Sequence, residues 1–559
     1  MKDTAGFLRV RSSLLALLSL AGFGVVLSSS VGYDIEWVPP QTVFGLFGLV
    51  PLSFWLGIAL IMLSMLLGIR SKNEHLFFLQ ALLLFVSIWG APSFFERFPS
   101  VWDSYGHYQS VESVMRYGIS GAGTTSYQFS YPGFFILSAS YSSLGSPPVL
   151  LFLRFYPIFS STLTLLALYL FTRTYIAGVD YRFALVVSML ADVWIQVHFS
   201  PESLGLAMGL LVFVFLEKDG LEWLLAAISA FAYVVISHPT TVLFVLGAIA
   251  IKEIIVRTTR LRRKWSYQRL EKPWPISIFL LMWISWLFTG AITLFTLQAG
   301  QIYSHLSFIS NIPEALGGTV QQRAAENIFA TSPQIRLFLL GSLVLLAGSS
   351  LAYYIFTRRR RDLALPANTI ALFILPIIVV PLDLVLLGGQ IYDRGILYLI
   401  LGASMIITLV IVSRSRGILR RIIAVGVLIV VFLGMTTTFY QETLYVTSEE
   451  SLKATEFLQS GMISDSVVVG GMIPPYIWGE HPSETFSRLG FTSSYPLTLV
   501  NLTGGVVPGA LVFDRTSELW SAQYGYSYVY DFYINDALNY SKVYDSGAYW
   551  VSYRGATTL

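Results

Sequence analysis

The stretch Arg394-Gly-Ile-Leu-Tyr-Leu-Ile-Leu-Gly-Ala-Ser-Met-Ile-Ile-Thr-Leu-Val-Ile-Val-Ser413 decides the fold class, because no residue after its first carries a charge. A helix of about 20 apolar residues is long enough to cross a bilayer. Similar runs recur along the whole chain of 559 residues, of which 55% are hydrophobic and 12% are charged. The sequence therefore predicts an all-α polytopic membrane protein and argues against a soluble one.

The apolar runs predict about thirteen transmembrane helices. The first run follows Lys2, Arg9 and Arg11, and no small-residue cleavage site precedes the next run, so we expect a retained signal-anchor helix. The runs are 12–29, 42–69, 76–93, 148–172, 182–198, 201–217, 220–237, 239–256, 275–297, 334–357, 367–388, 394–413 and 421–438.

The basic residues predict how the chain is oriented. Lys and Arg gather in alternate connections, at 1–11, 70–75, 252–273, 358–361 and 414–421. Loops rich in positive charge stay on the cytoplasmic side. All these clusters fall on one side only if residues 131–144 do not cross, and about 14 residues are too few for a comfortable span. We therefore expect an outer interfacial helix there, a cytoplasmic N-terminus and an extracytoplasmic C-terminus in the cell membrane.

The last part of the chain differs in kind from the rest. It reads as a helix at 450–458, a buried strand at 466–470 and a closing hairpin at 542–553, separated by turn residues. This pattern predicts two domains, a transmembrane domain over 1–438 and a small extracytoplasmic α/β domain over 439–559.

Composition also narrows the chemistry. The chain has no cysteine, so disulfides, thiolate nucleophiles and Cys-ligated metal sites are excluded. The net charge of +3 is small, and we expect the lipid bilayer rather than nucleic acid as a partner. There is no internal repeat of the kind that marks many transporters.

The predicted outer loop 94–147 carries Val101-Trp-Asp-Ser-Tyr-Gly-His-Tyr108. If this segment is helical, Asp103 and His107 share one face, because they are four residues apart. A carboxylate and an imidazole at a membrane boundary can handle a proton. The alternative is that Asp103 only caps a helix that begins at Ser104.

Other ionisable residues fall at the same predicted boundary: Glu202, His238, Arg394, Arg154 and Asp192. Charges are costly inside a bilayer and usually face a partner or a cavity. Arginine binds phosphate through paired hydrogen bonds, and a carboxylate can accept the proton of an attacking hydroxyl. Together they suggest a pocket for a substrate with a phosphate and a hydroxyl nucleophile.

Each of these residues also has a structural interpretation. Arg394 could extend its charge to the interface, and His238 could cap the helix that follows it. Glu202 could lie in a first helical turn that the helix dipole favours. Asp192 could bond to Gln196 one turn later.

The order of these features resembles the GT-C superfamily of polyprenol-linked-sugar glycosyltransferases, in particular its archaeal members. That family has an acid in its first large external loop, matched by Trp102-Asp-Ser-Tyr-Gly-His-Tyr108, with interfacial helices that Tyr131-Pro-Gly-Phe-Phe135 resembles. Phe199-Ser-Pro-Glu-Ser203 is similar to the segment that carries the family's second acid. Residues 298–333 are similar to its long external loop, and Arg394 is similar to its arginine near the outer end of a late helix. A soluble α/β domain after the last span is also common there.

The resemblance implies an inverting enzyme that moves a sugar from a polyprenyl-phosphate carrier to a glycan or glycoprotein acceptor on the outer face. Asp103 would be the base and Glu202 the second catalytic acid. Arg394, with Arg154, would bind the carrier phosphate, and the other substrate-binding residues would be His107, His238 and Asp192.

Two departures from the family pattern matter. Asp103 stands alone rather than in an Asp-x-Asp motif, because Ser104 and Tyr105 follow it, and no Trp-Trp-Asp signature is present in the tail. Both favour a monophosphate carrier, and we expect no cofactor and no obligatory divalent metal. The alternatives are an oligosaccharyltransferase or ligase that uses a polyprenyl diphosphate, a multi-span transporter or flippase, and a non-catalytic scaffold.

Overall fold

A computed structural model defines the fold. It describes residues 12–69, 71, 73–119, 127–145, 147–261, 276–305, 329, 331–356, 365–386, 391–412, 417–459, 468–469, 510–523, 531, 534–535, 537–538, 540–547 and 549–553. Most of the predicted external loop 298–333 and much of the tail lie outside these residues.

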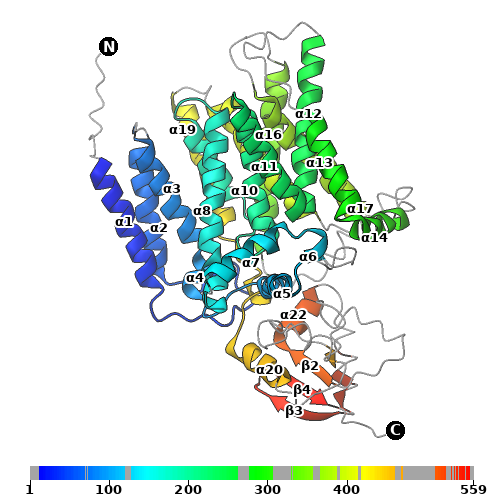
Figure 1. Ribbon diagram of the computed structural model, residues 1–559. Helices are drawn as coiled ribbons and strands as arrows, with labels where there is room; N and C mark the ends of the chain where they lie inside the picture. The colour runs from blue at the N-terminus through cyan, green and yellow to red at the C-terminus, as the bar shows by residue number, and fades with distance from the viewer. Residues whose placement is uncertain are drawn as a thin grey trace.

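Helices dominate the molecule and run between two ends of one large bundle (Figure 1). A smaller α/β part lies at the end where α4 to α7 are found. The bundle contains α1 (Ser12–Ser29), α2 (Leu52–Gly68), α3 (Glu74–Trp89), α8 (Val149–Tyr175), α9 (Tyr181–Ala191), α10 (Pro201–Leu216), α11 (Leu221–Ser237), α12 (Pro239–Leu261), α13 (Ile276–Thr289), α16 (Ser332–Phe356), α17 (Ala367–Leu386), α18 (Tyr392–Ile407) and α19 (Gly417–Met435).

Among the described residues, six helices are long and apolar enough to cross a membrane, or seven if α13 and α14 (Ile292–His305) form one bent span. The six lie in α1, α8, α12, α16, α17 and α18. These helices indicate a multi-pass membrane protein, as predicted. Each of the thirteen predicted runs contains helical residues, but α2, α3, α9, α10 and α11 are shorter than 18 residues, and α19 is not among the candidate spans. Thirteen crossings therefore remain a prediction.

Several predicted runs are broken where the backbone cannot continue as a helix. The run 42–69 starts as a short 3₁₀ turn, Gly45–Gly48, and becomes helical only after Pro51. The run 182–198 ends as a helix at Ala191, which leaves 192–200 irregular, and 275–297 bends by 90° between α13 and α14. In each case the hydropathy of the run identified an apolar segment correctly but did not show where the helix starts, ends or bends.

The centre of the bundle is α18. Its residues 395–407 are all buried, and the helix continues into a π-helical turn, Thr408–Val412. Gly402 makes this position possible, because a Cβ there would lie 2.7 Å from the backbone nitrogen of Phe373 in α17. The run that decided the fold class therefore forms the helix around which the others pack.

Short helices cover one end of the bundle: α4 (Ala91–Phe95), α5 (Trp102–Tyr117), α6 (Tyr127–Ser130) and α7 (Gly133–Gly145). α5, α6 and α7 belong to the predicted outer loop 94–147, whereas α4 begins in the preceding run, and all four gather below α8, α10 and α11 in Figure 1. The helix α7 has 13 residues and lies across the end of the bundle rather than along it. This agrees with the expectation that 131–144 does not cross.

The link to the C-terminal part is held by charged and buried polar groups. Arg97 pairs with both Glu36, at 3.0 Å, and Glu449, at 2.5 Å. Nearby, Glu96 and Glu442 are almost fully buried. Burial, together with the charge of Glu442, raises the pKa of Glu96 well above its ordinary value, and burial raises the pKa of Glu442 to about 7. The pair therefore retains a proton when other carboxyl groups have lost theirs.

The described residues of the tail contain a four-stranded sheet in the order β1-β2-β4-β3. β1 (Val468–Val469) is parallel to β2 (Ala510–Asp514), and β4 (Tyr549–Tyr553) is antiparallel to both β2 and β3 (Ser541–Asp545). The helices α20 (Glu449–Gln459) and α22 (Arg515–Gln523) accompany the sheet. The predicted helix, strand and hairpin are thus confirmed, while the domain boundary at 438 and its side of the membrane remain predictions.

The orientation can be tested in this cysteine-free background. Ser143 of α7 and Ser541 of β3 are exposed at the end that we expect outside, and Ala177 is exposed between α8 and α9 at the other end. We expect Ser143→Cys and Ser541→Cys to react with a membrane-impermeant maleimide on intact cells, and Ala177→Cys to react only after lysis. Labelling of Ala177→Cys before lysis would reverse the orientation.

Candidate functional site

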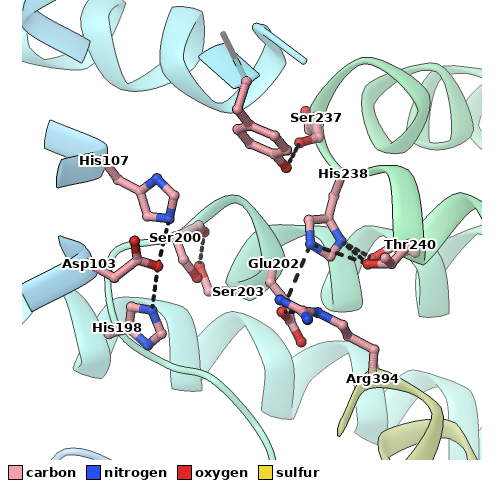
Figure 2. A network of polar contacts seen from close by, with 12 residues as sticks. Asp103, His107, His198, Ser200, Glu202, Ser203, Ser237, His238, Thr240 and Arg394 are labelled. Atoms are coloured by element: carbon pink, nitrogen blue, oxygen red, sulfur yellow. Dashed lines mark hydrogen bonds and ion pairs between the residues drawn. The ribbon is translucent and has the colours of Figure 1, made fainter. Parts of the chain in front are cut away.

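The first polar cluster of the site centres on Asp103, in the first turn of α5. Its Oδ2 lies 3.1 Å from Nε2 of His107 and 3.8 Å from Nε2 of His198 (Figure 2). The Asp103 side chain is 45% exposed, whereas the two imidazoles are 18% and 13% exposed. A half-exposed carboxylate thus lies between two largely covered imidazoles, and the predicted pairing of Asp103 with His107 is confirmed.

The start of α5 separates the two interpretations of Asp103. The N-cap is Val101, and no side chain caps the helix. Val101 has φ 65°, a strained conformation for a β-branched residue, and its amide donates to the carbonyl of Tyr445. Asp103 is therefore not the N-cap, and the helix begins two residues earlier than Ser104. Strain of this kind is concentrated at functional sites.

The electrostatics of Asp103 reflect its neighbours. Desolvation alone would raise the pKa of this carboxyl, but the charge and hydrogen bond of His107, with the nearby imidazole of His198, hold the pKa far below its ordinary value. Asp103 therefore remains ionised at any physiological pH. It is in the form that accepts a proton, although a depressed pKa makes it a weak base.

The second polar cluster joins three elements of the bundle. Oε2 of Glu202, in the first turn of α10, accepts a hydrogen bond of 2.8 Å from Nε of Arg394 in α18. The same oxygen lies 3.9 Å from Nε2 of His238, between α11 and α12. The side chains of Glu202 and His238 are 5% and 7% exposed, and that of Arg394 is 29% exposed. Arg394 is therefore paired inside the protein, which argues against simple extension to the interface.

Backbone contacts set the positions of this cluster. Oδ2 of Asp383, in α17, accepts from the amide of Ile391, the N-cap of α18, and so fixes the turn that presents Arg394. His238 bonds through Nδ1 to the hydroxyl of Thr241 at 2.7 Å, which holds the imidazole at the start of α12. Gly205, one turn after Glu202, lets α10 approach closely, because a Cβ there would lie 3.3 Å from Cβ of His238.

The two clusters are connected through Phe199. This fully buried ring packs at 4.8 Å from Phe134 of α7 and 4.9 Å from Tyr156 of α8. Because His198 precedes it and Glu202 follows three residues later, its burial fixes one residue of each cluster. Figure 2 shows both clusters in one view, with the 198–203 segment between them.

Tyr127 of α6 lies between the clusters. Its hydroxyl donates to the carbonyl of Ser237 at 3.1 Å. Burial raises the pKa of Tyr127 above its ordinary value, and the charges of Arg394, Glu202 and Asp103 all reach its hydroxyl. The hydroxyl of Tyr127 therefore lies within electrostatic reach of residues from both clusters.

Asp192 does not have the predicted partner, Gln196. It is the C-cap of α9 and is 4% exposed, so no helical turn follows to bring Gln196 to it. Arg336 of α16 lies within electrostatic reach of it. The Arg336 guanidinium donates to the carbonyl of Val193 at 2.8 Å and lies 4.4 Å from the ring of Trp194.

Arg154 belongs to another part of the molecule. Its Nε donates to the carbonyl of Ser93 at 3.1 Å, and its charge acts on Glu96. These contacts bind α8 to the segment after α3. The structure therefore brings together Asp103, His107, Glu202, His238 and Arg394, with Asp192 nearby. Arg154 lies elsewhere, where α8 contacts Ser93 and Glu96.

Sequence reasoning missed three contributors to the site: Arg336, Tyr127 and the role of His198. Arg336 could have been found, because it is a lone charge near the outer start of an apolar run, the same signal that marked Arg394. His198 and Tyr127 gave no local signal, since their importance comes only from neighbours distant in the chain.

Among the residues that the structure describes, no group of three or more His, Asp or Glu side chains is arranged to hold a metal ion. Whether the site needs a metal therefore remains a matter of prediction. No family model matches the chain, and no curated protein matches it either. The resemblance to GT-C enzymes accordingly rests on the residues of this chain.

The Glu202–Arg394 pair can be tested for its structural contribution. Removing one partner from a buried ion pair leaves an unpaired charge, which typically costs about 3–5 kcal/mol, whereas an apolar replacement of both is often neutral. We expect Glu202→Leu and Arg394→Met each to lower the unfolding free energy by this order, and the double variant to recover most of the loss. Denaturant unfolding in detergent micelles measures this, and a double variant as unstable as the summed single variants would contradict the pairing.

Proposed function

We propose that this protein is a membrane glycosyltransferase that transfers a sugar from a polyprenyl monophosphate to a hydroxyl of a glycan or protein acceptor on the outer face. One observation carries the proposal: an ionised, half-exposed carboxylate, Asp103, and the arginine Arg394 lie in two polar clusters at the same end of an apolar bundle. A carboxylate accepts protons, and a guanidinium binds phosphate oxygens.

The reaction follows from these two groups. The acceptor hydroxyl attacks the anomeric carbon of the sugar from the face opposite the phosphate. A new C–O bond forms, the bond from the anomeric carbon to the phosphate oxygen breaks, and the electron pair leaves with the polyprenyl phosphate. Asp103 takes the hydroxyl proton, so atoms and charge balance, and the configuration at the anomeric carbon inverts.

Arg394 would stabilise the negative charge that grows on the departing phosphate, the kind of electrostatic contribution that usually dominates catalysis. Its bond to Glu202 through Nε fixes the plane of the guanidinium, which a planar, bidentate contact with phosphate requires. Glu202, which resembles the second acid of the family, would thus act by orienting Arg394. His238 supports Glu202 from the other side.

The architecture supports a lipid-linked donor. The polyprenyl chain would remain in the bilayer beside the bundle, while its phosphate meets the polar end where α5, α6 and α7 lie. Thirteen crossings, an extracytoplasmic α/β domain and an outward-facing site complete the proposed arrangement.

The proposal is tested with purified protein and a panel of radiolabelled polyprenyl-phosphate sugars and acceptors. We expect transfer by the parent chain, and a loss of about 10²- to 10⁴-fold in Asp103→Asn, the range typical of a missing general base. Thermal unfolding of Asp103→Asn should stay close to that of the parent, because Asp103 caps no helix.

Glu112→Gln is the matched control, because Glu112 is a second carboxyl group of α5 and lies outside the two clusters. It should keep nearly full activity. Asp103→Asn with more than about a tenth of the parent rate would remove Asp103 as the base. Transfer only from polyprenyl diphosphates would replace the proposed donor with that of a ligase.

Arg394→Lys separates phosphate binding from charge alone. An ammonium cannot reproduce the paired hydrogen bonds of a guanidinium, so we expect transfer to fall by about tenfold or more, with the change in donor KM and kcat rather than in acceptor KM. Donor kinetics equal to those of the parent would show that Arg394 does not bind the phosphate.

A further inference from the structure

His198 is an imidazole of the site to which the reaction above gives no task. It lies in the irregular segment between α9 and α10, far in sequence from Asp103, yet its Nε2 lies 3.8 Å from Oδ2 of that residue. His107 approaches the same oxygen from within α5, at 3.1 Å. Figure 2 shows the carboxylate between the two rings. Among the described residues, the polar contacts of Asp103 are to these two histidines alone.

Packing alone does not account for His198. Its Nε2 is buried and has no hydrogen-bond partner in the described structure, an arrangement that costs stability. A movement of about 1 Å would bring it within hydrogen-bond distance of Oδ2. Contacts of this kind in catalytic sites are often long without substrate and shorten when it binds.

The backbone on both sides of His198 is firmly held. The carbonyl of Val197 accepts a hydrogen bond from the hydroxyl of Ser160 in α8, and Phe199 is buried among aromatic rings. Tyr156 and Ser203 bond to each other at 2.8 Å and secure the turn that follows. The ring of His198 is therefore presented to Asp103 by the scaffold of the bundle.

We propose that His198 is a positioning residue for Asp103: with His107 it holds Oδ2, so that Oδ1 faces the acceptor hydroxyl. The inference rests on the proposed transfer reaction and adds to it how the carboxylate of Asp103, the proposed base, is oriented. A carboxylate on a rotatable side chain, 45% exposed, needs two contacts from different elements to keep one oxygen directed at a substrate.

The two imidazoles also make the base dependent on pH. When they are protonated, Asp103 is strongly paired and its pKa is held low, so it is a poor proton acceptor. When they are neutral, the carboxylate regains basicity, and transfer is faster. The rate should therefore rise with pH as the imidazoles lose their protons. The other charged or titratable groups around Asp103 are Tyr127, Glu202, His238 and Arg394.

The kinetic test compares kcat from pH 5 to pH 9 in the parent, His198→Gln and His198→Ala. Glutamine can still donate a hydrogen bond to Oδ2 but does not titrate. We expect His198→Gln to keep most of the parent rate at pH 8 and to lose less of it at pH 6, whereas His198→Ala should be about tenfold slower at every pH. Acceptor KM should change little in either.

A second measurement does not depend on activity. The chain has six histidines, so the ring signals of a histidine-labelled sample can be assigned by single substitutions and followed by NMR. We expect Asp103→Asn to shift the ring signals of His198, because the carboxylate that lies 3.8 Å from its Nε2 loses its charge. His75, at the opposite end of α3, is the control and should not move.

The outcomes separate the two proposals. Unchanged ring signals of His198 in Asp103→Asn, or a parent-like rate in His198→Ala, would overturn the positioning role even if the transfer reaction is established. A parent that transfers no sugar but shows the shifted ring signals would refute the reaction while keeping the contact. Activity that chelators abolish, Zn²⁺ restores and His198→Gln loses with its bound metal would make His198 a ligand instead.

Discussion

The ion pair between Glu202 and Arg394 is the interaction on which the site depends. A carboxylate in the first turn of an apolar helix is costly unless a cation meets it, and the cation comes from α18, whose residues 395–407 are all buried. The pair therefore fixes the relative position of α10 and α18. It also restrains the orientation of the guanidinium, because Nε of Arg394 donates to Glu202.

Aromatic packing performs the corresponding task for Asp103. The carboxylate belongs to a short helix outside the bundle, and Phe134, Phe199 and Tyr156 form the contact that holds this outer layer against α8 and α10. The left-handed conformation of Val101 shows that the entry to α5 is held under strain. Rigid packing beside a strained turn is the arrangement expected where a side chain must be presented accurately rather than buried.

Sequence patterns predicted the elements better than their ends. Hydropathy located helical segments throughout the chain, and the short length of 131–144 correctly set it apart as α7. It failed at Ala191, where the apolar composition continues through Val193, Ile195 and Val197 although the helix has ended. Composition measures how readily a segment leaves water, and a buried irregular segment satisfies that measure as well as a helix does.

By itself the sequence determined the membrane class, the polar end of the bundle and five of the residues that meet there, because apolar run length and misplaced charges are local properties of the chain. Only the tertiary structure decided the partners. It paired Glu202 with Arg394 across 192 residues, placed His198 opposite His107 on one oxygen of Asp103, and moved Arg154 to the junction with Ser93 and Glu96. Which residues contact each other depends on which helix faces pack together. That packing follows from all the contacts in the bundle rather than from any one segment of the sequence.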